Sequence, residues 1–346
     1  MKNIKIRISN NKTKINKIKK NLTKKQYNKL EYPYKNLQIT KKELLELFEE
    51  FKKFKPKFIN VKRVKRKIKK FNNRFTILNE LYEENKKYND ITDYFSQYCR
   101  ARCIFNLREN KNILTLFQEN KKNIYNELLK KNQEINYFNI EEYLYKKYSQ
   151  CTNFNITIMF SLLKIFKPKY FLDFSAGWGD RLIGAIAYDC NYLGIDPSNC
   201  MKTKYKKIIN TLCPKNKRKN YNIINKGYED VEIEKNKYDL VFTSPPFFDL
   251  EIYENTKKQS HKKFNSVKKW KNNFLFPSIK KSYDALKTNG YLGLYITDYK
   301  NNYYIKDMKD FINKKIKNMK YLGDIHWVNY PNVKNIRSIF VWKKIK

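Results

Sequence analysis

Histidine, closely spaced cysteine and long apolar runs are all scarce in this sequence, and each shortage excludes a class of protein. Among 346 residues there are two histidines, His261 and His326, and of six cysteines only Cys99 and Cys103 lie close together. A tetrahedral zinc site needs four such ligands at short spacings, so no metal site is expected. A disulfide framework is not expected in a chain this long, and we interpret the cysteines as reduced thiols. No apolar run approaches membrane-spanning length and no apolar signal core is present, so we expect a soluble, intracellular protein.

Acidic residues are scarce as well. The chain has 33 aspartates and glutamates against 75 lysines and arginines, which gives a formal net charge of +42. AT-rich coding enriches lysine, but it also favours glutamate, and acids lag far behind here. A field this positive attracts polyanions. The composition therefore favours a nucleic-acid partner over codon bias alone.

The first 150 residues differ from the rest in charge and in the spacing of their apolar side chains. Residues 1–40 contain one acid, Glu31, and predict a basic flexible arm, or at most one short strand in IKIRI. Residues 41–150 have apolar side chains at helical spacing and predict a basic, mainly helical region. Its segment VKRVKRKIKKF predicts either a solvated helix face or a helix that contacts phosphates. The candidate nucleic-acid-binding residues of this segment are Lys62, Arg63, Lys65, Arg66, Lys67, Lys69 and Lys70.

Residues 151–346 alternate between strand and helix signals. The apolar segments YFLDF, NYLGIDP, YNIIN, YDLVFTSPP and GYLGLYITD are separated by helical segments. This alternation predicts an α/β fold with a Rossmann-like, doubly wound and mostly parallel sheet. The closing segments YLGDIHWVNY and SIFVWKK predict a C-terminal antiparallel hairpin.

Acids and glycines follow the predicted strands. Asp173 ends the first strand, and Gly177 and Gly179 lie in the turn after it, where a ligand can approach the backbone closely. Asp196 follows the second strand, where an acid can accept both hydroxyls of a ribose. Glu229 and Asp230 follow the third strand, where a carboxylate can meet an adenine amino group. Since parallel strands end at one edge of a sheet, these acids predict a nucleotide-like ligand there.

Four of these segments carry a resemblance to a known family. DFSAGWG, GIDPSN, NKGYED and TSPPFF, in that order, resemble the S-adenosylmethionine-dependent methyltransferase fold. The SPPF motif resembles the amino-methyltransferases that modify the exocyclic nitrogen of adenine or cytosine, and the segment from 150 to 346 looks most similar to DNA methylases of phages and large viruses. The resemblance implies S-adenosylmethionine as cofactor. It implies cofactor contacts at Asp173, Ser175, Gly177, Gly179, Asp196, Glu229 and Asp230, and at Thr152 and Phe154 ahead of the first strand.

The glycine turn departs from the family pattern. The family commonly has D-P-F-x-G-S-G, whereas this chain has Phe174, Ser175 and Trp178 at the variable positions. The motif order, with the cofactor motif first and SPPF second, fits one permutation group of the family. Few residues follow Phe247 beyond those that finish the sheet. Target recognition is therefore expected to come from the N-terminal helical region or from the loop after the motif, or to be minimal.

The SPPF motif has a chemical rationale. An exocyclic amine conjugated to its ring is a poor nucleophile, because its lone pair is delocalised. The hydroxyl oxygen of Ser244 and the carbonyl oxygen of Pro245 can accept its two N–H groups and aim the lone pair at a methyl group. Pro245 and Pro246 fix the backbone in advance, and Phe247 can stack on a base swung out of its helix. These four residues are the predicted catalytic residues.

Several alternatives stay open. Cap-adjacent adenosine methyltransferases of RNA also join a helical region to a catalytic domain, and their motif is N-P-P-F. Ser244 departs from that asparagine, so the substrate is expected to be DNA, with RNA as the rival. A non-catalytic nucleic-acid-binding partner with the same fold is a further alternative. Asp249, Glu251 and Tyr253 follow the motif and are expected either to contact the base or to order the loop.

Overall fold

The computed structural model describes residues 23, 27–59, 81–83, 85–105, 109–298, 302–328 and 337–346. The seven basic residues predicted to bind nucleic acid, from Lys62 to Lys70, lie outside the described residues. No helix in the described part of the chain is long and apolar enough to cross a membrane.

The described part of the first half of the chain is mainly helical, as predicted. Its helices and short strands are η2 (Lys35–Leu37), α2 (Lys41–Lys52), β1 (Phe58–Ile59), β2 (Leu81–Glu83), α4 (Asn89–Arg100), β3 (Ile104–Phe105), α5 (Ile113–Lys130) and α6 (Tyr137–Tyr148).

The second half alternates strands with helices. Its first part contains α7 (Ile156–Phe166), β4 (Tyr170–Asp173), α8 (Asp180–Tyr188), β5 (Asn191–Ile195), α9 (Asn199–Leu212), η3 (Lys215–Asn220), β6 (Tyr221–Ile224), η4 (Tyr228–Asp230) and β7 (Tyr238–Thr243). Its second part contains β8 (Glu251–Ile252), α10 (Ser260–Lys263), α11 (Val267–Trp270), the π-helical turn η5 (Lys271–Leu275), α12 (Phe276–Ala285), β9 (Leu286–Leu294), α13 (Tyr304–Lys315), β10 (Met319–Val328) and β11 (Arg337–Lys344).

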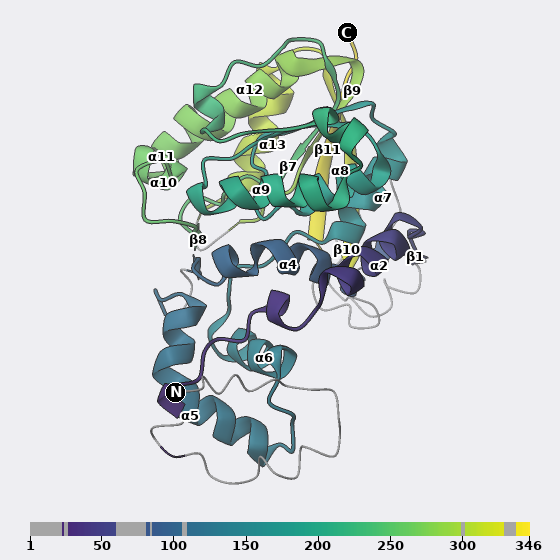
Figure 1. Ribbon diagram of the computed structural model, residues 1–346. Helices are drawn as coiled ribbons and strands as arrows, with labels where there is room; N and C mark the ends of the chain where they lie inside the picture. The colour runs from purple at the N-terminus through teal and green to yellow at the C-terminus, as the bar shows by residue number, and fades with distance from the viewer. Residues whose placement is uncertain are drawn as a thin grey trace.

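A single large sheet organises the molecule (Figure 1). Its strand order is β1-β2-β10-β11-β9-β7-β4-β5-β6, and β6, β5, β4, β7 and β9 are mutually parallel. β11 runs antiparallel to both β9 and β10, which confirms the predicted C-terminal hairpin. The predicted α/β, Rossmann-like fold is therefore confirmed. The sequence did not predict the two N-terminal strands, of which β2 pairs in parallel with β10.

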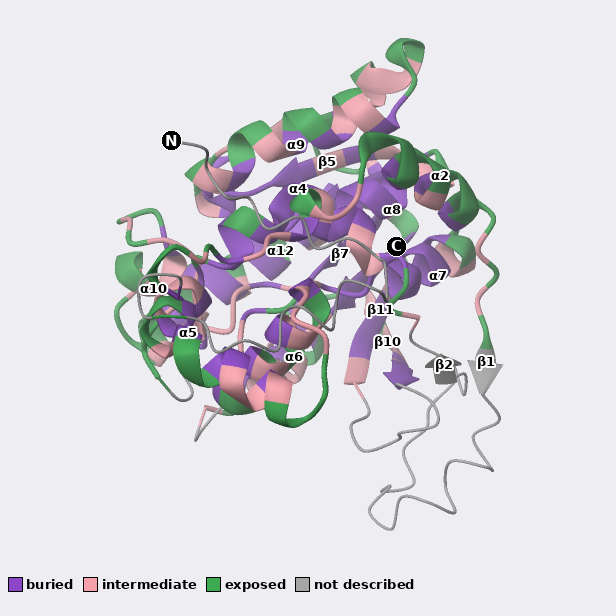
Figure 2. Cartoon of the chain, turned by 60° about the horizontal axis from the view of Figure 1, so that its bottom comes forward, coloured by how far each residue is buried: buried purple, intermediate pink, exposed green. Residues whose placement is uncertain are grey.

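The N-terminal helices share a core with the sheet. Leu44 and Phe51 of α2 and Phe95 of α4 belong to the same buried cluster as Phe160 of α7 and Ile183 of α8. Figure 2 shows α7 and α8 almost entirely buried between the sheet and this layer. The boundary predicted near residue 150 therefore does not separate two hydrophobic cores.

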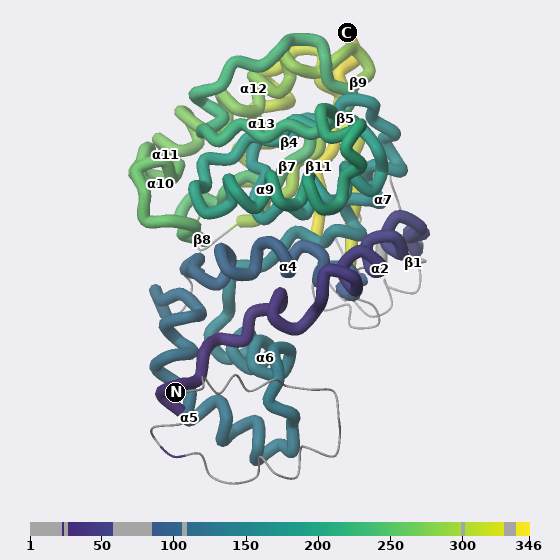
Figure 3. Tube along the Cα trace, viewed as in Figure 1, coloured from purple at the N-terminus to yellow at the C-terminus, as the bar shows by residue number. Residues whose placement is uncertain are grey.

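Residues 27–40 are not a flexible arm, which corrects the prediction for that part of the segment. Tyr27 and Tyr32 are buried in a second cluster with residues of α5 and α6, and the ring of Tyr32 lies 5.5 Å from that of Phe117. Figure 3 shows this segment running along α5 and past α6 toward α2. The reason is that three tyrosines within eight residues provide apolar surface, which outweighs the charge of the neighbouring lysines. Residues 1–22 and 24–26 lie outside the described part of the chain.

Candidate active site

The candidate site lies at the carboxyl edge of the parallel strands. β4 ends at Asp173, β5 is followed by Asp196, and β7 is followed directly by Ser244. β4 pairs in parallel with both β5 and β7, so these three strand ends are neighbours. The predicted cofactor and catalytic residues are thus brought to one edge by adjacent strands.

The turn between β4 and α8 is shaped by two glycines in the left-handed region, Gly177 at φ +58 and Gly179 at φ +90. A Cβ atom at Gly179 would lie 2.6 Å from Cδ1 of Ile208, so the Ile208 side chain would have to shift, and at this φ a residue other than glycine is strained. The carbonyl oxygen of Gly177 accepts a 2.5 Å hydrogen bond from the hydroxyl of Tyr205 on α9. The turn is therefore fixed tightly against α9.

Asp173 is completely buried, and every acceptor position of its carboxylate is in use. Oδ1 accepts from the Thr243 hydroxyl at 2.8 Å and from the backbone N–H of Ser175 at 3.3 Å. Oδ2 accepts from the Tyr192 hydroxyl at 2.8 Å and from Nε of Arg181 at 2.7 Å. An ionised carboxylate has about four lone-pair sites, so none is left for a ligand. This geometry assigns Asp173 the role of joining the turn, β5 and β7; its direct contact with a cofactor stays a prediction.

Arg181 is the buried cation of the site. Its side chain is 3% exposed, it pairs with Asp173, and it also donates to the carbonyl oxygen of Ser175. Its guanidinium lies 5.7 Å from the ring centroid of Phe154. The neighbouring carboxylate keeps the pKa of Arg181 above its ordinary value despite burial. Ser175 and Phe154, both predicted cofactor contacts, therefore lie around one guanidinium group.

Asp196 retains capacity to bind a ligand. Its Oδ2 accepts a 2.8 Å bond from the N–H of Gly177, and its Oδ1 accepts a 2.9 Å bond from the N–H of Ser198. Burial raises its pKa to about 6, while these two bonds act in the opposite direction. Each oxygen has one lone-pair site left, which is what a pair of ribose hydroxyls requires.

Glu229 and Asp230 lie in η4, after β6, where the prediction places them. Nζ of Lys263 is 2.6 Å from Glu229 and 2.7 Å from Asp230, so one lysine neutralises much of their charge. Oε2 of Glu229 is buried and has no hydrogen-bond partner among the described residues. Tyr228, next to them, stacks on Phe174 at a centroid distance of 4.8 Å. This stacking explains the aromatic residue at a position where the family pattern differs.

The SPPF motif is half-buried at the end of β7. Ser244, Pro246 and Phe247 are partly exposed and Pro245 is buried. The ring of Phe247 lies 5.9 Å from that of Tyr295, which in turn contacts Phe154 at 5.7 Å. The motif therefore faces an aromatic wall that continues to the predicted cofactor residue Phe154. Thr152, the other residue predicted there, is exposed.

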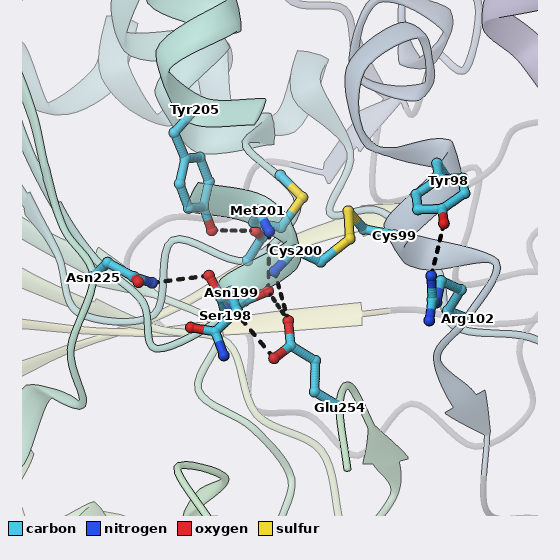
Figure 4. The surroundings of a disulfide bond; sticks show 11 residues. Tyr98, Cys99, Arg102, Ser198, Asn199, Cys200, Met201, Tyr205, Asn225 and Glu254 are labelled. Atoms are coloured by element: carbon cyan, nitrogen blue, oxygen red, sulfur yellow. Dashed lines mark hydrogen bonds between the residues drawn. A yellow bond between two sulfur atoms is a disulfide. The ribbon is translucent and has the colours of Figure 1, made fainter. Parts of the chain in front are cut away.

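Residues 99–105 are joined to the start of α9, to the segment before α7 and to β8. Disulfides join Cys99 to Cys200 and Cys103 to Cys151, and β3 pairs with β8. The prediction of free thiols is therefore wrong for four of the six cysteines, because helix α4 packs on α9 and brings Cys99 within bonding distance of Cys200 (Figure 4). Cys200 lies close after Asp196, and Cys151 directly precedes Thr152.

The loop after SPPF is ordered by contacts with the cofactor side of the site. Tyr253 packs edge-on against Trp178 of the glycine turn at 5.6 Å. The Glu254 carboxylate accepts from the Ser198 hydroxyl at 2.6 Å and from the N–H of Cys200 at 2.9 Å, at the start of α9 (Figure 4). Desolvation raises the pKa of Glu251, in β8, to about 7. Of the two roles predicted for this loop, these contacts support ordering of the loop.

Sequence reasoning missed three residues of the site. Thr243 is the first residue of the quoted segment TSPPFF, and Arg181 lies two residues after DFSAGWG. A charged residue just after a strand and a glycine turn was the available signal for Arg181. Glu254 had no signal, because its partners lie in a distant part of the sequence.

No family model matches the chain, and no curated protein matches it. Among solved structures, 1,6-didemethyltoxoflavin-N1-methyltransferase of Burkholderia thailandensis is similar at 7% identity and a TM-score of 0.40, over 55% of this chain and 78% of that one. The tRNA methyltransferase TrmI of Aquifex aeolicus is similar at 10% identity and a TM-score of 0.39, over 57% and 71%. A SAM-dependent O-methyltransferase of Thermotoga maritima is similar at 9% identity and a TM-score of 0.37, over 59% and 70%. At these values the likeness carries no information about reaction or substrate.

Proposed function

We propose that the protein is an S-adenosylmethionine-dependent methyltransferase that acts on the exocyclic amino group of adenine or cytosine in DNA. One observation carries the proposal. The Thr243 hydroxyl donates a 2.8 Å hydrogen bond to Asp173, and this bond ties the residue before SPPF to the strand that begins the glycine turn. The motif that fits an amine-bearing ring is thereby fixed beside the motif that fits a nucleoside.

The residues present fit the proposed cofactor. Asp196 keeps one acceptor site on each oxygen, and Gly177 and Gly179, both at positive φ, shape the turn beside it. When bound, S-adenosylmethionine supplies a methyl group already activated by its sulfonium centre. The protein therefore needs no covalent nucleophile, and positioning and electrostatics carry the catalysis.

The chain's own residues orient the amine. The Ser244 hydroxyl oxygen and the Pro245 carbonyl oxygen accept hydrogen bonds from the two N–H groups of the amine. The nitrogen lone pair then points away from both acceptors. Pro246 limits the backbone freedom of this pair. Phe247, backed by Tyr295, offers an aromatic face for the base. The net charge of +42 favours a polynucleotide substrate. In a polynucleotide, the target base must leave its stack to reach this site.

The test is a methyl-transfer assay with labelled S-adenosylmethionine on duplex DNA, single-stranded DNA and capped RNA, followed by nucleoside mass spectrometry. We expect N6-methyladenine or N4-methylcytosine from DNA. Ser244→Ala should lower turnover by about 10²-fold or more, since a positioned polar contact is lost, and should leave cofactor affinity nearly unchanged. Ser161→Ala is the matched control, because among the described residues that hydroxyl bonds only to the carbonyl of Thr157 within α7.

Three outcomes would contradict the proposal or one of its assignments. Label that appears only in RNA would transfer the function to the RNA methyltransferases. Cofactor binding without transfer to any substrate would favour the non-catalytic nucleic-acid-binding role. Loss of cofactor affinity in Ser244→Ala would remove Ser244 from its assigned position.

A further inference from the structure

The segment that follows the loop after SPPF carries charged side chains of positive sign only. Between Asn255 and Asn273 there are seven lysines and no aspartate or glutamate. This segment includes α10 and α11, which lie next to each other in the structure (Figure 1). A segment of this kind repels itself unless a partner supplies negative charge.

Two of the seven lysines have acidic partners and five do not. Lys263 pairs with Glu229 and Asp230, and Lys271 pairs with Asp307. The other five are exposed and make no ion pair with any described residue; we name them the rim cluster, which consists of Lys257, Lys258, Lys262, Lys268 and Lys269.

Lysines on the longer helices behave differently. Lys146 on α6, Lys280 on α12 and Lys314 on α13 each pair with an acid four residues earlier or later on the same helix. Such pairs reduce the local field at little cost. In the rim cluster the charge is left to face solvent.

Aromatic packing holds the rim cluster against the catalytic motif. Phe248, directly after the SPPF motif, packs on Trp270 at 6.2 Å and on His261 at 6.5 Å. Trp270 is fully buried, and its indole N–H donates a 3.1 Å hydrogen bond to the Ser260 hydroxyl. These contacts fix α10 and α11 relative to the motif.

Lys258 connects the same cluster to the cofactor side. Its Nζ donates a 3.1 Å hydrogen bond to Oδ1 of Asn199, the first residue of α9. Asn199 lies three residues after Asp196 in the chain. The segment that carries the rim cluster is therefore linked to Phe248 through His261 and Trp270 and to the start of α9 through Lys258, and both links lie beside the candidate site.

We propose that the rim cluster binds the phosphate backbone of the DNA strand whose base enters the site. This inference rests on the proposed function. Phosphate contacts position a polynucleotide without specifying sequence, which is what a strand needs when one base is swung out beside it. Uncompensated lysines on a fixed segment next to Phe247 supply such contacts.

The experiment compares two triple variants of the full chain that remove the same charge. The test variant is Lys257→Gln/Lys268→Gln/Lys269→Gln, in which no side-chain hydrogen bond of the described structure is lost. The control is Lys315→Gln/Lys317→Gln/Lys320→Gln, at the end of α13 and the start of β10. These three lysines are exposed and lie at the amino edge of the sheet, opposite the site. Binding of a fluorescent DNA duplex is measured by anisotropy between about 50 and 300 mM NaCl.

Each lost phosphate contact lowers the slope of log K against log salt by about 0.9, so the test variant is expected to lose up to about 2.7 and the control much less. S-adenosylhomocysteine affinity should be the same in all three proteins. Equal slopes in the test variant and the control, with wild-type methyl transfer to DNA intact, would refute the rim cluster and leave the proposed function standing. A slope change on RNA with none on DNA would refute the assignment to DNA. Wild-type protein that neither binds nor methylates a polynucleotide would refute the proposed function itself.

Discussion

Replacement of Arg181 by methionine tests whether the site is held by its buried ion pair. Asp173 is 0% exposed and Arg181 is 3% exposed, and 2.7 Å separates Oδ2 from Nε. Without the guanidinium, the carboxylate keeps three donors and no countercharge. Removing one partner of such a pair costs about 3–5 kcal/mol, because the remaining charge is desolvated and uncompensated. We expect a loss of this size in the free energy of unfolding, measured in urea at neutral pH.

An exposed pair in the same sheet provides the comparison. Lys287 and Asp239 are 3.0 Å apart, with side chains 40% and 30% exposed, and their separation by Lys287→Met should cost no more than about 1 kcal/mol. The double variant Arg181→Met/Asp173→Asn should recover part of the loss, since neither charge of the pair remains. A cost below about 1 kcal/mol for Arg181→Met, equal to that of Lys287→Met, would refute the claim that this pair holds the site together.

Three further predictions concern the cofactor side. In the folded protein without ligand, the pKa of Asp196 is raised to about 6, above its unfolded value. At neutral pH its ionised carboxylate therefore lowers the stability of the folded state, and hydrogen-bond donors of a ligand can offset this cost. We therefore expect S-adenosylhomocysteine affinity, measured by calorimetry, to fall about tenfold per pH unit below pH 6, and Asp196→Asn to abolish that dependence; a wild-type affinity that stays flat to pH 5 would contradict the ribose role. Reduction of the disulfide between Cys99 and Cys200, 101 residues apart, should lower the free energy of unfolding by up to about 4.7 kcal/mol, and Cys99→Ser should make the protein insensitive to reductant at this pair. An unchanged urea midpoint after mass spectrometry has verified free thiols would exclude a stabilising role. Gly179→Ala should cost about 1–3 kcal/mol and weaken cofactor binding, because its Cβ would lie 2.6 Å from Ile208 at a positive φ; wild-type thermal stability would show that the turn relaxes freely.

The fold was accessible from the sequence because its signals are local. Alternating apolar strands and helices predict the parallel sheet, and parallel strands place their ends together, which located Asp173, Asp196 and Ser244 at one edge. Partners across the fold were not accessible in the same way. No local sequence pattern identifies Glu254 as a partner of α9 or Cys99 as a partner of Cys200. Both contacts depend on how α4 and the loop after SPPF pack against α9.

The N-terminal strands were missed for a related reason. β1 has two residues and β2 has three, which is too short for a period of two to be recognised. Likewise, residues 27–40 were predicted to be flexible from their charge, while the tyrosines that bury there find partners only on α5 and α6. The charge of a segment predicts how well water solvates it, but it does not show whether a neighbouring helix provides an apolar surface for its tyrosines.

The pairing of β2 with β10 also sets an order in which the molecule can form. Leu81 lies opposite His326, so this contact closes a loop that contains all the parallel strands from β4 to β9. During synthesis β2 must wait until β10 has been made, and until then one edge of the growing sheet is open to other chains. A fragment that begins at residue 151 would keep that edge open permanently, and it would also lack the helices that complete the core around α7 and α8. The N-terminal half thus covers one edge of the sheet and completes the core behind it.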